Sequence, residues 1–121
     1  MYETKISFYL KSNRVHIYTE VLRAIGSPKR ICFMIGKNGR TLLIAPYEKR
    51  DFKSHGVPDK VYKSVVSMEI NSIRLCRLIA EAHNWDITRS YRVPGKINIK
   101  QNVAVFDLSN AEIIRKNSIG K

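Results

Sequence analysis

The sequence has few cysteines and no long apolar run, and each shortage excludes a class of protein. Only Cys32 and Cys76 are present, each inside an apolar stretch and without the close spacing of a zinc knuckle or a redox pair. We therefore expect two buried thiols in a reducing, cytoplasmic compartment. The apolar run Leu42–Pro46 is far too short to span a bilayer, so we expect no membrane partner.

Motifs of catalysis are also missing. The chain has no phosphate-cradling glycine loop, HExxH pair, GxSxG elbow or cysteine–histidine metal spacing. Its histidines, His16, His55 and His83, each lack a nearby cysteine or clustered acid that would indicate activation. We therefore expect a protein that is not an enzyme, with no cofactor, no metal and no small-molecule substrate.

Acidic residues are scarce beside basic ones. Asp and Glu number 10 against 22 Lys and Arg, which gives a net charge of +12. Residues 1–60 hold 12 basic and 5 acidic residues and the remainder 10 and 5, so the excess is not confined to a tail. Positive charge spread over a folded body attracts polyanions such as nucleic acids, although it can also serve only to keep a protein soluble.

The N-terminal segment alternates with a period of two residues. Ile6, Phe8 and Leu10 alternate with polar residues, a turn follows at Ser12 and Asn13, and Val15 and Ile17 then alternate with Arg14, His16 and Tyr18. This pattern predicts two strands with one buried face and one basic, aromatic, solvated face. Thr19 is predicted to cap a short helix that runs to Ile25 and stops at Gly26.

A β-hairpin is the clearest local prediction. Its arms are Ile31–Ile35 and Thr41–Ala45, and the connection contains Asn38-Gly39, which favours the positive φ angles of a tight turn. Both arms are almost continuously apolar. We therefore expect both faces of the hairpin to be covered, either by the other half of the chain or by a second copy.

The remaining chain divides into a linker and a second folded half. Residues 48–64 are polar and basic without sustained periodicity, which predicts a solvated linker. A strand is expected near residues 65–70, and Asn71 or Ser72 should cap a helix that runs to about Trp85. The apolar stripe of this helix comprises Leu75, Cys76, Leu78, Ile79 and Ala82, and Arg77 and Glu81 have the spacing of an ion-paired solvated face.

The C-terminal part should add a second hairpin. Strands are expected over residues 90–98 and 103–108, with Pro94 and Gly95 marking a bulge or a sheet edge. Ser109 and Glu112 have capping-box spacing and predict a short helix over residues 111–115.

The two halves, 1–47 and 65–121, share the order strand, helix, hairpin. Each half is too thin to form a core alone. We therefore expect a mixed α+β, mainly β fold in which two strand–helix–hairpin halves interlock into one barrel and each covers the other's apolar hairpin. The sequence leaves open whether this barrel closes within one chain or between two.

One stretch resembles a known family. Residues 13–26 read Asn-Arg-Val-His-Ile-Tyr-Thr-Glu-Val-Leu-Arg-Ala-Ile-Gly, which is similar to the Gly-Arg-Val-Val-Ile-Pro-x-Glu-Leu-Arg-x-x-Leu-Gly pattern of the SpoVT/AbrB family. This family includes AbrB-type transition-state regulators and MazE-type antitoxins, and the resemblance covers about residues 5–47. It implies a swapped-hairpin, double-psi-like barrel in a homodimer that binds double-stranded DNA.

The resemblance also implies which residues touch DNA. Arg14 takes the place of the arginine that opens the second strand, and Arg23 that of a helix arginine. Lys5, Lys11 and His16 join them because the alternation places them on the solvated side near Arg14. Two positions depart from the pattern: Tyr18 stands where the family usually has proline, and Leu22 replaces a frequent arginine. The second half is patterned as a folded, basic unit, which disfavours an antitoxin role.

These observations support one leading function and two alternatives. We expect a DNA-binding transcriptional regulator or accessory factor whose basic strand-and-loop face, centred on Arg14 and Arg23, docks against the duplex. The first alternative is a scaffold module that has lost DNA binding and meets an acidic protein, which the departures at Tyr18 and Leu22 favour. The second is RNA binding, because Tyr9, Tyr18, Tyr47 and Tyr91 could stack on bases.

Overall fold

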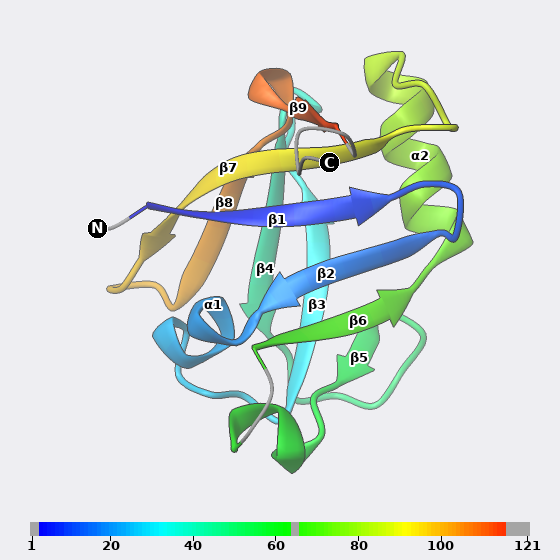
Figure 1. Cartoon of the computed structure of the whole chain (residues 1–121). Coiled ribbons are helices and arrows are strands. Elements are labelled where there is room, and N and C mark those ends of the chain that lie inside the picture. Colours follow the sequence, from blue (N-terminus) through cyan, green and yellow to red (C-terminus); the bar gives the residue numbers. More distant parts are fainter. Residues whose placement is uncertain (1–2, 64–65, 116–121) are drawn as a thin grey trace.

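The computed structural model describes residues 3–63 and 66–115, which form a strongly curved antiparallel sheet with two helices (Figure 1). The strands are β1 (Glu3–Tyr9), β2 (Arg14–Tyr18), β3 (Arg30–Ile35), β4 (Thr41–Pro46), β5 (Ser54–Gly56), β6 (Ser67–Asn71), β7 (Ser90–Asn98), β8 (Val103–Asp107) and β9 (Glu112–Ile114). The helices are α1 (Thr19–Ala24) and α2 (Ile73–His83), and two short 3-10 turns are η1 (Asp59–Tyr62) and η2 (Leu108–Asn110). The mainly β class is confirmed.

The sheet joins both halves of the chain into a nearly closed barrel. Its strand order is β5-β3-β4-β8-β7-β1-β2-β6, with β9 added on β7. β4 pairs with β8, β1 with β7 and β2 with β6, so every one of these contacts joins an early strand to a late one. The two halves therefore share one core.

The core fills the concave side of the sheet, and α2 covers one end of it. Among the fully buried side chains are Ile6, Phe8, Ile17, Leu42, Ile44, Ile97 and Phe106. Helix α2 adds Cys76, Ile79 and Ala80. The indole of Trp85, just beyond α2, stacks on Tyr91 with 4.4 Å between ring centroids and meets the edge of Phe8 at 5.5 Å. This aromatic packing fixes the end of α2 against the barrel.

The predicted hairpin is present as β3 and β4, but the expectation that both of its faces are covered is wrong. The side chain of Met34 is 43% exposed. The register pairs Met34 with Leu43, and neighbouring residues of an antiparallel pair share a face. Because the inward face is lined by Ile31, Leu42 and Ile44, Met34 and Leu43 lie on the convex face of the barrel.

The segment predicted to be a solvated linker has structure. It contains β5, which pairs with β3, and η1, which lies against α1. Val57 and Val61 are buried in the common core. These two valines are four residues apart within a polar stretch. Two apolar positions are too few to produce a recognisable period. The prediction of a linker over residues 48–64 is therefore corrected.

The predicted C-terminal helix is also wrong. Residues 112–114 form β9, which pairs with Ser90–Arg92 of β7. β8 pairs only with Gly95–Asn98 of that strand, so the earlier part of β7 has a free edge that β9 occupies. Pro94 lies between these two partners, in a strand that β1 pairs along its other side. The missing N–H of Pro94 is therefore tolerated within the sheet, without the predicted bulge or edge strand.

Several local predictions shift by a residue or a face. Thr19 lies inside α1, whose N-cap is Tyr18, and its hydroxyl donates to the carbonyl oxygen of Val61 at 3.4 Å. Ser72 caps α2 as predicted, but Leu78 is 54% exposed and Ala80 is buried in its place. Strand β6 starts at Ser67; Val65, the predicted start, lies outside the described residues.

Candidate nucleic-acid interface

Three of the five predicted contact residues share the convex face of β1 and β2. The Nη1 atom of Arg14 lies 3.2 Å from Oε1 of Glu69 on β6, and Nε2 of His16 bonds to the other oxygen of the same carboxylate. Lys5 lies over the ring of Tyr18, with Nζ 5.7 Å from its centroid. Glu69 therefore offsets much of the positive charge of Arg14.

Arg23 lies apart from this cluster. Arg14 opens β2, whereas Arg23 is on α1, beyond the other end of the strand. At about 3.3 Å per residue the strand alone separates them by about 13 Å. The Nη2 atom of Arg23 donates to the carbonyl oxygen of Tyr62 at 2.7 Å. The structure does not bring Arg14 and Arg23 together at one place on the surface.

Lys11 lies in the turn between β1 and β2, and this turn is bound to the start of α2. The backbone N–H of Ser72 donates to the carbonyl oxygen of Asn13 at 2.8 Å. The hydroxyl of Ser72 in turn accepts from the backbone N–H of Leu75 at 3.2 Å. The turn residue Asn13 has a φ of 55°, a conformation that asparagine tolerates better than most residues. Lys11 and α2 are therefore held in a fixed relation.

Two adjacent hollows lie around Lys11. One, of about 320 Å³, is lined by Leu10, Lys11, Asn13, Cys76, Arg77, Ala80, Ile87 and Thr88. The other, of about 640 Å³, is lined by Tyr9, Lys11, Ser12, Thr88, Arg89, Ser90 and Ile114. Both include Lys11 and Thr88, so they are contiguous. We call the area defined by Lys11, Arg77 and Arg89 the turn–helix surface.

The cations of the turn–helix surface are not neutralised by ion pairs. Within residues 3–63 and 66–115, no carboxylate lies within 4.0 Å of the charged nitrogens of Lys11, Arg77 or Arg89. The expected pair of Arg77 with Glu81 is not formed. Lys11 and Arg77 can therefore act on an anion outside the protein, and Arg89 can do so against the nearby charge of Asp86.

Asp86 shapes the loop that carries Arg89. Its Oδ1 atom accepts hydrogen bonds from the hydroxyl of Thr88 at 2.7 Å and from the backbone N–H of Thr88 at 2.9 Å. These bonds, and to a smaller extent the positive charge of Arg89, hold the pKa of the Asp86 carboxyl below its usual range. The N–H of Arg89 donates to the carbonyl oxygen of Asp86 at 3.0 Å. The loop is thus ordered by its own polar groups.

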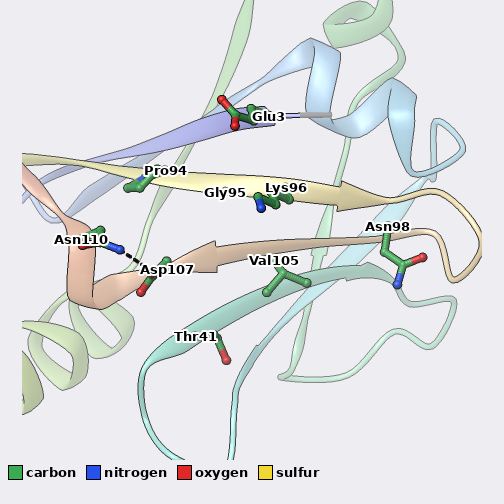
Figure 2. Close-up of a pocket in the computed structure, with 9 residues that line it drawn as sticks. All are labelled: Glu3, Thr41, Pro94, Gly95, Lys96, Asn98, Val105, Asp107 and Asn110. Carbon is green, nitrogen blue, oxygen red and sulfur yellow. Dashed lines mark hydrogen bonds between the residues drawn. The ribbon is translucent and has the colours of Figure 1, made fainter. Parts of the chain in front are cut away.

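A further hollow lies on the convex face of β4, β7 and β8 (Figure 2). It measures about 600 Å³ and is lined by Glu3, Thr41, Pro94, Gly95, Lys96, Asn98, Val105, Asp107 and Asn110. Asp107 is held by the side-chain amide of Asn110 at 2.6 Å. Two carboxylates accompany a single lysine in this lining, so it lacks the cationic excess of the turn–helix surface.

Three other properties of the described part of the chain concern metal binding, thiol reactivity and membrane spanning. No group of three His, Cys, Asp or Glu residues there could hold a metal ion. Both thiols are buried as predicted, and burial raises the pKa of Cys76 to about 11 and raises that of Cys32. No helix within that part has the length and apolar character needed to cross a membrane.

Comparison with known proteins gives no relative. The sequence matches no protein-family model, and neither a curated protein nor a solved structure is similar to the chain. The resemblance of residues 13–26 to the SpoVT/AbrB pattern therefore rests on that local pattern alone.

Sequence reasoning missed two of the three cations of the turn–helix surface. Arg77 was assigned to an ion-paired helix face, and Arg89 was not singled out. No local signal marks either residue, because each reaches Lys11 only through the docking of α2 beside the β1–β2 turn.

Proposed function

We propose that this protein binds double-stranded DNA, as a transcriptional regulator or an accessory factor, by docking the turn–helix surface against the duplex. The observation that carries the proposal is the grouping of Lys11, Arg77 and Arg89 around contiguous hollows, with no ion pair to a carboxylate at any of the three among the described residues. Such unpaired cations can replace the counterions of a phosphate backbone, which is the main source of affinity for duplex DNA.

The rigidity of the surface supports this use. The three cations come from a turn, a helix and a loop that are joined by the Ser72–Asn13 hydrogen bond and by the packing of Trp85. Cations that are already positioned lose less conformational entropy when they meet a regular array of phosphates. The net charge of +12 adds a long-range attraction that speeds the encounter.

The resemblance to SpoVT/AbrB modules points the same way. In that family, basic residues of the first loop and the short helix touch DNA, and Lys11 lies in the corresponding first loop. Lys5, Arg14 and His16 then act as flanking contacts along β1 and β2, whereas Arg23 reaches the duplex only if it wraps past β2. A homodimer with exchanged hairpins, which the resemblance also implies, would present two such surfaces to symmetric half-sites.

The salt dependence of duplex binding tests the proposal. Replacing Lys11, Arg77 and Arg89 together by alanine should lower the slope of log affinity against log salt by about 2.7, at about 0.9 for each lost phosphate contact. The matched control replaces Lys37, Lys60 and Lys96, three exposed lysines outside this surface, by alanine. Equal losses in the two triple variants would show that diffuse charge, and not this surface, holds the duplex.

A second candidate is an interaction module for an acidic protein. Apolar side chains favour it: Ile87 lines one of the hollows and is 65% exposed, and an apolar group gains nothing from a phosphate backbone. A pull-down with the intact chain, performed with and without nuclease, separates the two functions. A protein that stays bound after nuclease treatment, and that is lost with Ile87→Ser, supports the interaction module.

A further inference from the structure

The loop between β4 and β5 exposes an aromatic ring among cations. Phe52 is 82% exposed, the largest exposed fraction of any large apolar side chain among the described residues. Lys53 follows it directly and Arg50 precedes it by two residues, and Nζ of Lys53 lies 5.9 Å from the centroid of its ring. The ring of Phe52 buries little apolar surface in the isolated protein, so it is available to stack on a ligand.

Hydrogen bonds to Asp51 order this loop. Tyr47 donates its hydroxyl to Oδ2 of Asp51 at 2.8 Å, and the backbone N–H of Lys53 donates to Oδ1 at 2.9 Å. The N–H of Ser54 donates to the carbonyl oxygen of Asp51 at 3.1 Å. These bonds hold the pKa of the Asp51 carboxyl below its usual range. Phe52 is therefore presented at the tip of a fixed turn and not on a loose strand.

A basic hollow adjoins the loop. It measures about 580 Å³ and is lined by Ile25, Gly26, Pro28, Lys29, Arg30, Pro46, Tyr47, Glu48, Arg50 and Asn102. Three cations face one carboxylate in this lining. The Nε and Nη2 atoms of Arg30 donate to the hydroxyl of Ser54 at 3.0 and 2.7 Å, which orients its guanidinium group. We call this hollow, together with Phe52, the loop site.

The loop site lies apart from the turn–helix surface. In Figure 1 the β4–β5 loop and the start of β3 lie at the bottom of the molecule, whereas α2 is at the upper right. The linings of the hollows at the two places share no residue. One location can therefore be altered without touching the other.

We propose that the loop site binds single-stranded nucleic acid. An unpaired base stacks on the ring of Phe52, and the neighbouring phosphates enter the hollow beside Lys29, Arg30 and Arg50. Base–aromatic stacking combined with a cationic groove is the general physical solution for binding unpaired strands without sequence preference. A duplex hides the faces of its bases, so it would leave Phe52 without a partner. This inference uses different residues from the proposed duplex site and stands independently of it.

The test measures the fluorescence anisotropy of a labelled oligothymidine of about 12 nucleotides, a length suited to a single small binding site. Phe52→Ala should weaken binding about tenfold, the loss expected for one stacked base, and Phe52→Tyr should restore it. Arg50→Ala should weaken binding and lower its salt slope by about 0.7. Leu78→Ala, which shortens another exposed apolar side chain, should have no effect.

Separate outcomes decide this proposal and the duplex proposal. The variant lacking Lys11, Arg77 and Arg89 should keep the Phe52-dependent part of oligothymidine binding even if duplex binding is lost. An unchanged affinity of Phe52→Ala for the oligonucleotide would overturn the loop site. The proposal would also be overturned if the protein bound vesicles of anionic phospholipid through Phe52 but did not bind the oligonucleotide. The exposed ring would then serve a lipid surface. The emission of Trp85, the single tryptophan, verifies folding in each variant.

Discussion

The two ends of this molecule present positive charge in different ways. At the turn–helix surface, Trp85 packs between Phe8 and Tyr91 and supports the end of α2, while hydrogen bonds to Asn13 and Asp86 order the turn and the loop that carry Lys11 and Arg89. At the loop site, the supporting contacts are hydrogen bonds to a single exposed carboxylate, Asp51, and the apolar group is the one that projects. The first arrangement offers cations at fixed spacing, and the second offers a ring.

This difference indicates different ligands for the two ends. Fixed cations without an exposed ring suit the outside of a duplex, where the phosphates are accessible and the bases are stacked. A ring beside a cationic hollow suits a strand whose bases are free. A protein with both would hold a duplex and an adjoining unpaired strand together.

The largest effect on stability is expected when the aromatic support of the turn–helix surface is removed. Trp85→Ala should lower the free energy of unfolding by about 3 kcal/mol, because it removes a large ring from between two aromatic partners. Phe52→Ala should change it by less than about 0.5 kcal/mol, since its ring is exposed. Urea unfolding followed by circular dichroism measures both. Similar losses in the two variants would mean that the ends are not supported differently.

A smaller effect is expected from loosening the loop. Asp51→Asn removes the charge that orders the turn, and oligothymidine affinity should fall about 2- to 10-fold, the range for one lost hydrogen bond. The hydrogen bond to Asp51 is the main cause that raises the pKa of Tyr47, so NMR should show this pKa falling toward 10 in the variant. Duplex binding through the turn–helix surface should not change; a parallel loss there would contradict the independence of the two ends.

The pH dependence of the same loop has a definite sign. The pKa of Asp51 is lowered in the folded protein from an ordinary value of 3.8. The stability that the ionised Asp51 carboxylate contributes to the folded protein is therefore fully present above pH 3.8. It is lost as the pH falls through the lower pKa of the folded state. The loop should stay ordered at neutral pH.

Strands β1 to β4 could be predicted from the sequence because their signals are local. Alternation along β1 and β2 and the Asn38-Gly39 turn between β3 and β4 depend only on neighbouring residues. β9 could not be predicted, because the capping-box spacing of Ser109 and Glu112 fits a helix equally well. The free edge of β7 decides the outcome, and that edge exists only in the assembled sheet.

Some residues of the candidate site could likewise be predicted from the sequence, and others could not. Arg14 was selected through the resemblance to the SpoVT/AbrB pattern, and Lys11 through the alternation that places it near Arg14. The neutralisation of Arg14 by Glu69 could not be found, since β2 and β6 are joined only through long-range pairing. Arg77 and Arg89 were missed for a related reason: their proximity to Lys11 depends on how α2 docks. Cations in the sequence therefore locate an interface only after their carboxylate partners are known.

The smallest expected effect concerns that carboxylate. Glu69→Gln keeps the shape of the side chain but releases Arg14 and His16, which lie on the strands that lead from the β1–β2 turn. If these residues flank the duplex site, affinity should rise about threefold and the salt slope should steepen by about 0.9, one additional phosphate contact. Stability should change by less than about 1 kcal/mol, because the ion pair is exposed. Glu48→Gln makes the same change of charge at an exposed position after β4, away from β1, β2 and β6; an equal rise there would assign the gain to net charge and remove Arg14 from the interface.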